Sequence, residues 1–103
     1  MEQRVLPETA LLLDGELKQN ALLQNDSALR MFVLQVKGDI DFELDASIAS
    51  RDWQEVLTIA TKAGDAKWQR RAKGELGLTA FVEGDILTAR KLVGTALVEA
   101  TLA

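Results

Sequence analysis

Short breaks between long helix-favouring segments are the feature that most limits what this chain can fold into. Two Gly-Asp dipeptides, Gly64-Asp65 and Gly84-Asp85, interrupt such segments. Glycine takes the left-handed conformation that closes a helix, and Asp caps the start of the next one. A connection of only two residues makes the helices that it joins lie antiparallel. The spacing therefore predicts stacked helix hairpins.

The breaks and the apolar periodicity together predict five helices. Their expected ranges are 8–24, 28–43, 46–63, 66–83 and 86–102. Ser27 or Asp26 is the expected N-cap of the second helix, because short polar side chains accept hydrogen bonds from the first free backbone N–H groups. Gly15 weakens the prediction for the first helix, since glycine disfavours helix interiors.

Three apolar stripes indicate which faces of these helices are buried. In the first helix the stripe is Ala10, Leu13, Leu17 and Leu23; in the second it is Leu29, Phe32, Val33, Val36, Ile40 and Leu44; in the third it is Ala46, Ala49, Trp53, Val56, Ala60 and Ala63. An alternative breaks the third helix at Arg51-Asp52, because Asp52 and Glu55 have the spacing of a capping box. The stripe keeps its phase across this point, which favours one continuous helix.

Composition supports an all-α fold in a single domain spanning residues 1–103. The chain has 103 residues, 48% of them hydrophobic, with one Pro and 5% aromatic residues. Good helix formers dominate, and no hairpin dipeptide separates alternating segments typical of strands. Trp53 and Trp68 are expected to pack between helices.

The residue types that are missing exclude several function classes. The net charge of −4 gives no general attraction to nucleic acid or anionic membranes, and no apolar run reaches the roughly 18 residues of a membrane span. The sequence has no Cys and no His, so it lacks thiolate ligands, thiol nucleophiles and the commonest general base. We expect a cytoplasmic protein that is no enzyme and has no cofactor, metal, nucleic-acid or membrane partner.

The sequence also contains an internal repeat. Lys37–Phe42 (KGDIDF) matches Lys73–Leu78 (KGELGL) at an offset of 36, and Arg51–Val56 matches Gly84–Ala89 at an offset of 33. Repeats of this length, built from two helices each, are typical of stacked helical hairpins. Small residues at Gly77, Ala89 and Ala96 would let the last two helices approach closely.

The segment from Arg70 to Ala100 resembles a tetratricopeptide repeat. It has the family's order and spacing of small residues and turn: Leu76-Gly77, Gly84-Asp85, Ala89 and Ala96. Lys73 and Ala80 stand where that pattern has large residues, and no Pro follows the second helix. Residues 28–63 are a degenerate match. The resemblance implies a right-handed superhelix of antiparallel helix pairs that binds other proteins.

The resemblance also implies a concave groove lined by the first helix of each pair. The expected partner-binding residues are Gln35, Asp39 and Phe42 on the second helix, and Arg71, Glu75, Leu78 and Phe81 on the fourth, with Gly74 and Val82 beside them. Phe42, Leu78 and Phe81 would supply apolar contacts, and Arg71 and Glu75 would select charge. These apolar residues could equally pack against the first helix or a neighbouring chain.

Two charged segments are further candidate sites. Gly38–Asp45 places four acids at alternate positions, but a calcium loop needs Gly and Glu where Leu44 and Ser50 stand. A solvated helix face is the favoured interpretation. Five basic residues, Lys62, Lys67, Arg70, Arg71 and Lys73, could bind an acidic peptide, although a solvated surface is favoured here too.

The sequence thus predicts an interaction domain that belongs to a larger protein and binds a peptide or helix of a partner. The alternative is a structural module that forms homodimers or larger oligomers through its terminal apolar helix, most simply by two-fold pairing. A small all-helical enzyme is the remote third possibility.

Overall fold

The computed structural model contains six helices and describes residues 2–102, with side chains described for 6–85 and 87–95. The helices are α1 (Glu2–Gln19), α2 (Ala21–Asn25), α3 (Ser27–Leu44), α4 (Ala46–Ala63), α5 (Ala66–Val82) and α6 (Ile86–Leu102). No strand occurs among residues 2–102. The all-α prediction is confirmed.

An Asp side chain caps the start of each of the four longer helices that follow α2. The carboxylates of Asp26, Asp65 and Asp85 each accept a hydrogen bond from the backbone N–H three residues ahead, at 3.0–3.1 Å. Asp45 accepts from the N–H of Ser47 at 2.9 Å. These caps satisfy donors that the first helical turn leaves free, and they fix the helix starts where the sequence predicted them.

Gly64 and Gly84 form the predicted turns. Their φ angles are +68° and +89°, in the left-handed region that residues other than glycine rarely adopt. Gly64 is the C-cap of α4, and its N–H donates to the carbonyls at the end of that helix. α4 runs unbroken across Arg51-Asp52, which confirms the continuous-helix prediction.

The first helix differs from the prediction at both ends. α1 begins at Glu2 and contains Pro7, where the sequence predicted a helix only after this proline. Proline there removes a single backbone hydrogen bond near the helix start, which a helix tolerates best close to its N-terminus. α1 ends at Gln19, because the Asn20 side chain accepts from the Leu22 N–H at 2.9 Å and starts the separate α2.

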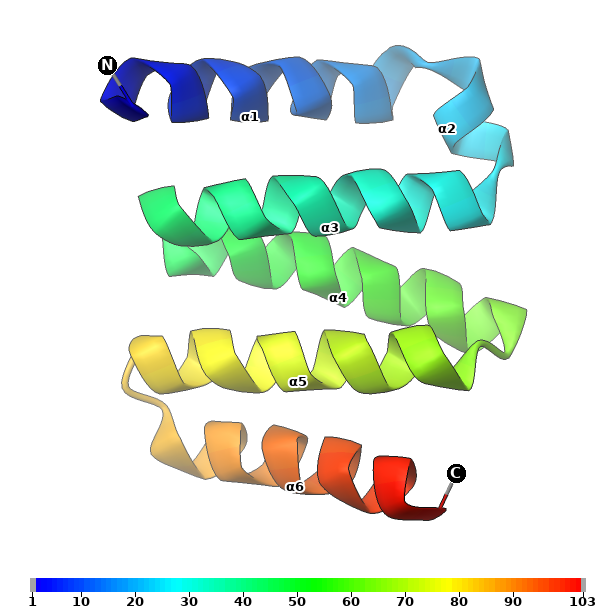
Figure 1. Cartoon of the computed structure of the whole chain (residues 1–103), viewed down its shortest axis with the longest axis vertical. Coiled ribbons are helices and arrows are strands. Elements are labelled where there is room, and N and C mark those ends of the chain that lie inside the picture. The colour runs from blue at the N-terminus through cyan, green and yellow to red at the C-terminus, as the bar shows by residue number, and fades with distance from the viewer. Residues whose placement is uncertain (1, 103) are drawn as a thin grey trace.

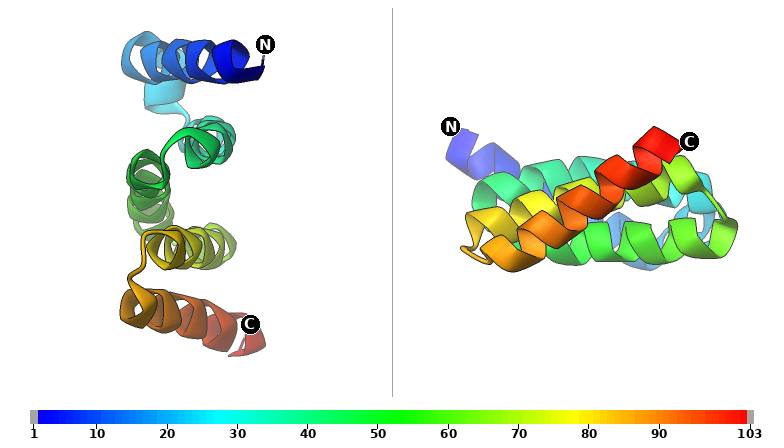
Figure 2. Two further views of the ribbon diagram at one scale, coloured as in Figure 1. Left: turned by 90° about the vertical axis from the view of Figure 1, so that its left-hand side faces the viewer. Right: turned by 90° about the horizontal axis from the view of Figure 1, so that it is seen from below.

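Successive long helices run antiparallel in one stack (Figure 1). α3 packs on α4, α4 on α5 and α5 on α6, whereas α1 packs on α3 at one end (Figures 1 and 2). Arg30 ties this end together: its Nη1 donates to the Leu17 carbonyl of α1 at 2.8 Å, and its Nε bonds the Glu55 carboxylate of α4. α1 and α6 therefore form opposite ends of the stack.

The core lies between these layers. Its buried residues are Leu17, Leu23, Met31, Leu34, Trp53, Val56, Ala60, Ala72 and Leu76. Trp53 is 1% exposed and Trp68 packs against the core from its edge, so both tryptophans lie between helices as predicted. The predicted stripe of α4 is confirmed at Ala49, Trp53, Val56 and Ala60, which are buried, but not at its two ends, since Ala46 is half-buried and Ala63 is exposed.

The predicted buried face of α3 is wrong. Leu29, Phe32, Val36 and Leu44 are exposed, whereas Met31, Leu34, Lys37, Gly38 and Asp41 are buried. Gly38 faces the core because the Trp53 ring of α4 lies against it, where a Cβ would be 2.7 Å from the indole Nε1. Lys37 and Asp41 face the core because they pair with each other and with Asp52. Counting apolar residues cannot detect a buried face made of a glycine and paired charges.

The close approach of α5 and α6 is confirmed at the residues the structure describes. A Cβ on Gly77 would lie 2.7 Å from the Val93 side chain and 3.3 Å from the Ala89 carbonyl oxygen. Ala89 is 5% exposed. The third small residue of the prediction, Ala96, lies outside the residues with described side chains.

The register of the repeat differs from the one predicted. Gly38 lies against Trp53 of α4 in the way that Gly77 lies against Val93 of α6. Matching Gly38 with Gly77 gives an offset of 39 between the first helices, in place of the predicted 36. Matching Trp53 with Val93, and the capping residue Asp45 with Asp85, gives an offset of 40 between the second helices, in place of the predicted 33. The letters that match at 36 pair Gly38 with Gly74, yet a Cβ on Gly74 would meet no atom within 4 Å.

Candidate functional site

An apolar groove lies between α5 and α6 at one end of the stack. Its volume is about 810 Å³. It is lined by Gly74, Gly77, Leu78, Phe81, Ala89, Arg90, Val93 and Gly94. Leu78, Phe81 and Val93 are 46%, 59% and 40% exposed, so large apolar side chains border it on both helices. An open apolar surface of this kind is typical of a site that a partner covers.

Two glycines leave empty space in the groove because they have no side chain. A Cβ on Gly74 or on Gly94 would meet no atom within 4 Å, so both glycines border open space. Gly77 has the opposite role, since it holds α5 and α6 in contact along one side of the groove. Glycine inside a helix costs roughly 0.5–1 kcal/mol relative to Ala, and packing within the chain does not offset that cost at Gly74 or Gly94.

The equivalent surface on the preceding hairpin is partly covered by a helix. At the structural offsets, Gly74, Leu78, Phe81 and Val93 correspond to Gln35, Asp39, Phe42 and Trp53. α5 covers the α4 side of that surface: the Arg71 guanidinium lies 5.7 Å from the centre of the Trp53 ring, whereas Asp39 stays exposed. Burial, and then the nearby Asp39 carboxylate, raises the pKa of Glu75. The α5–α6 groove is thus the surface on which a further helix of the stack would lie.

The structure separates the predicted partner-binding residues into two groups. Leu78 and Phe81 line the groove. Arg71 and Glu75 lie instead on the side of α5 that faces α3 and α4, where Glu75 is half-buried. Of the three residues predicted on α3, Gln35 and Phe42 are half-buried and Asp39 is exposed. The predicted charge selection by Arg71 and Glu75 therefore does not act inside the groove.

The sequence prediction missed the half of the groove that α6 supplies. Ala89, Arg90, Val93 and Gly94 were not among the predicted site residues, because the family resemblance places the site on first helices only. Gly94 is the signal that could have found them, since it is a glycine in the interior of an otherwise regular helix. Arg90 lines this edge of the groove and is exposed, so it gives the edge a positive charge.

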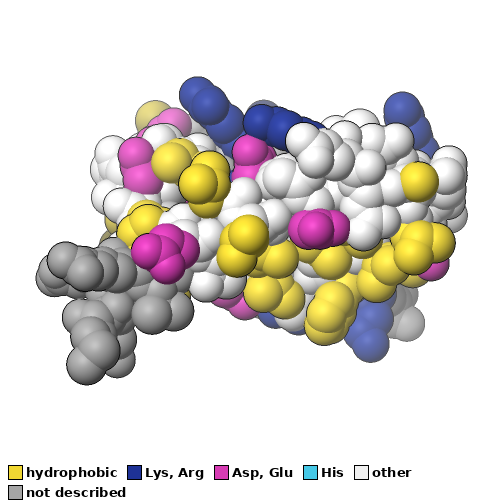
Figure 3. Space-filling view, turned by 90° about the horizontal axis from the view of Figure 1, so that it is seen from above, with side chains coloured by type: hydrophobic (Ala, Val, Ile, Leu, Met, Phe, Trp, Pro, Cys, Tyr) yellow, Lys and Arg dark blue, Asp and Glu magenta, His cyan; other side chains and the backbone are white. Residues whose placement is uncertain are grey.

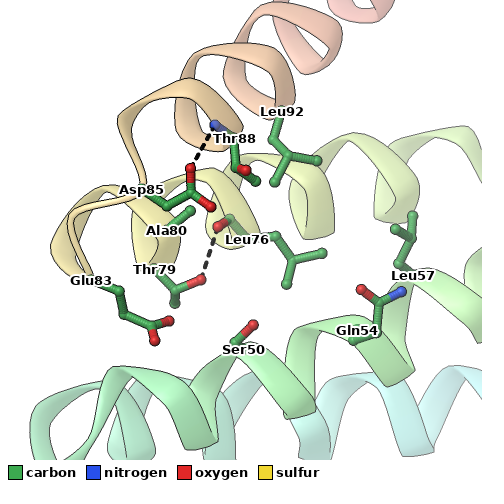
Figure 4. Close-up of a pocket in the computed structure, with 10 residues that line it drawn as sticks. All are labelled: Ser50, Gln54, Leu57, Leu76, Thr79, Ala80, Glu83, Asp85, Thr88 and Leu92. Atoms are coloured by element: carbon green, nitrogen blue, oxygen red, sulfur yellow. Dashed lines mark hydrogen bonds between the residues drawn. The ribbon is translucent and has the colours of Figure 1, made fainter.

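A second, smaller cavity of about 320 Å³ lies among α4, α5 and α6 (Figure 4). Two of its polar side chains, Thr79 and Asp85, hydrogen-bond to the backbone near them. The Thr79 hydroxyl donates to the Leu76 carbonyl at 2.8 Å, and the Asp85 carboxylate accepts from the Thr88 N–H (Figure 4). Both bonds are intrahelical or capping bonds, so neither group is arranged for chemistry on a substrate.

A buried charge cluster joins α3 to α4. The Lys37 Nζ donates to Asp41 Oδ2 at 2.6 Å and to Asp52 Oδ1 at 3.0 Å, and all three residues are at most 7% exposed. Asp52 Oδ2 is buried without a hydrogen-bond partner. The solvated face predicted for the acids of 38–45 is therefore wrong at Asp41, although Asp39, Glu43 and Asp45 are exposed.

The cluster perturbs the titration of its members. Burial first, and then the neighbouring Asp41 carboxyl, raises the pKa of Asp52 to about 7, against the opposing effect of Lys37. Burial disfavours the charged form of Lys37, but its two carboxylate partners outweigh burial and raise its pKa. The cluster joins two helices in the interior and lies away from the groove, so we assign it to the fold.

Two further findings bear on the site. Among the described residues, no group of three or more acidic, His or Cys side chains is placed to bind a metal ion. Over the same part of the chain, each helix is too short or too polar to cross a membrane.

Comparison with known proteins gives no assignment. The chain matches no protein-family model, and no curated protein or solved structure matches it.

Proposed function

We propose that this chain is a protein-interaction module without catalytic activity, and that the α5–α6 groove binds an amphipathic helix of a protein partner. One observation supports the proposal: on the preceding hairpin, a helix of this chain, α5, packs on the α4 side of the equivalent surface. A surface built to the same plan, with glycines that leave room for a backbone, fits a helix better than an extended peptide. Helix-in-groove binding is a common mode of recognition.

The charges around the groove favour an acidic helix. Arg90 and Lys91 are exposed on α6, and Arg70 lies one helical turn before Gly74 on α5. Acidic residues flanking the apolar stripe of a partner would pair with these side chains and speed its association. This selection differs from the predicted one, which relied on Arg71 and Glu75. The tetratricopeptide-repeat resemblance and the cytoplasmic location stay predictions.

A synthetic probe helix tests the proposal. The probe has the length of α6, 17 residues, with Leu on one face and Glu elsewhere, and carries a fluorophore for anisotropy titration. We expect binding to the full chain, and binding about tenfold weaker or worse to Gly94→Leu, because the new side chain fills the groove without meeting another atom within 4 Å of its Cβ. A probe with Lys in place of Glu should bind more weakly than the acidic one.

Thr58→Leu is the control. It places the same side chain at an exposed position in the interior of α4, away from the residues that line the groove and from α1. It should leave the affinity for the probe unchanged. If the wild-type chain does not bind the acidic probe, or if Gly94→Leu binds it equally well, the groove is not a helix-binding site.

A further inference from the structure

The end of the molecule opposite the groove also presents apolar side chains to solvent. α1 faces α3 with Ala10 and Leu17, which are 8% and 6% exposed. Its outward face carries Leu11 and Leu12, which are 74% and 71% exposed. The view onto this end shows hydrophobic side chains gathered in a band (Figure 3). Whereas α5 is packed between α4 and α6, α1 has a long helix on one side only.

Gly15 lies on the same outward face, three residues after Leu12 and four after Leu11. A Cβ there would meet no atom within 4 Å. The helix-interior glycines that border open space are thus Gly15 on α1 and Gly74 and Gly94 in the groove. All three carry the helix-propensity cost of glycine without a close contact inside the chain. Glycines on both surfaces would let two helix backbones approach closely.

The charges of the two surfaces are complementary. Glu8 and Glu16 are exposed on α1, and its other described acid, Asp14, pairs with Lys18 at 2.9 Å. The groove is bordered by the exposed Arg90 of α6. α1 is therefore the kind of acidic amphipathic helix that the groove suits.

We propose that α1 of one copy of this chain binds the α5–α6 groove of a second copy, head to tail. This inference rests on the proposed function of the groove and names its occupant. α1 and the groove lie at opposite ends of a molecule 38 Å long, so a chain cannot fill its own groove (Figure 1). Each copy offers one helix face and one groove, and such a heterologous contact grows into an open chain or closes into a ring.

A mixing experiment tests this arrangement. The face variant is Leu11→Glu with Leu12→Glu, at two exposed positions; the groove variant is Gly94→Leu. By sedimentation velocity, wild-type chain should increase in mass beyond a dimer as its concentration rises, and each variant alone should be a monomer. An equimolar mixture should form a one-to-one heterodimer and nothing larger, because one intact face and one intact groove remain.

Several outcomes would overturn head-to-tail pairing. They are a wild-type chain that stays monomeric at high micromolar concentration, a mixture that stays monomeric, and a face variant that still associates. The last result would point to two-fold pairing through α6.

Gly74→Leu is a second groove variant and should behave as Gly94→Leu, and circular dichroism should show the wild-type helix content in every variant. If the chain is monomeric but its groove binds the acidic probe helix, only the second-copy proposal fails. If the chain neither self-associates nor binds the probe helix, the proposed function fails too.

Discussion

At the residue scale, the glycines inside helices have two different physical roles. Gly38 and Gly77 let a neighbouring helix approach, since a Cβ on either would lie 2.7 Å from a side-chain atom of the opposite helix. Gly74 and Gly94 border open space. The sequence shows only that a glycine occupies a helix. The neighbouring helix decides which role it has.

Gly38→Ala should lower the free energy of unfolding by about 1–3 kcal/mol, because the new methyl group would press on the buried Trp53 ring. Gly94→Ala is the matched control, and it should raise stability by up to about 1 kcal/mol through helix propensity alone. Urea unfolding followed by circular dichroism measures both. A Gly38→Ala chain as stable as Gly94→Ala would mean that the Trp53 contact is not tight.

At the element scale, helix boundaries were predicted more accurately than helix faces. Asp at an N-cap and Gly in a left-handed turn act through the backbone nearest to them, so their effect depends little on the rest of the fold. The face of a helix depends on its neighbours. The α4 stripe was predicted correctly because its core residues are apolar, and the α3 stripe was wrong because Lys37, Gly38 and Asp41 face the core.

The cap of α6 is testable in isolation. The Asp85 carboxylate accepts hydrogen bonds from Thr88, which lower its pKa. Asp85→Ala should destabilise the chain and speed amide hydrogen exchange in the first turn of α6. Asp85→Asn keeps an oxygen that can accept the same bond and should have a smaller effect. Equal exchange rates in Asp85→Ala and wild type would show that the cap does not hold this turn.

At the scale of the whole molecule, the buried charge cluster should make stability depend on pH. In the folded chain the pKa of Asp52 is raised to about 7, whereas in the unfolded chain it is near 4. Between these values the folded state binds more protons than the unfolded state. This group's contribution to stability is therefore greatest at low pH and is lost as the pH rises through about 7, on the order of 2 kcal/mol between pH 5 and pH 8.

Asp52→Asn should remove that loss, because an amide does not ionise. The variant should unfold with nearly the same stability at pH 5 and pH 8, and it should be more stable than wild type at pH 8. Lys37 stays charged over this range, since its pKa is raised from an already high value, so it does not contribute to the difference. Urea titrations across this range measure the effect, and a parallel decline in both chains would show that Asp52 is not its source.

The α5–α6 groove shows how much of the candidate site could be predicted from the sequence. The family resemblance predicted a groove lined by first helices that included Leu78 and Phe81, and both residues line the α5–α6 groove. The residues of α6 were not predicted, and Arg71 and Glu75 lie toward Trp53 and Asp39 instead of in the α5–α6 groove. A groove between two helices depends on how closely and at what angle they pack, and no spacing within one helix contains that information.

By itself, the sequence determined the four long helices from α3 to α6, the turns between them and their antiparallel order, because capping, left-handed glycines and short connections act over a few residues. Only the tertiary structure decided which face of α3 is buried, in which register the hairpins repeat and where the groove opens. Those features depend on contacts between helices, such as Trp53 against Gly38 and Lys37 with Asp52, whose partners are 15 residues apart in the chain.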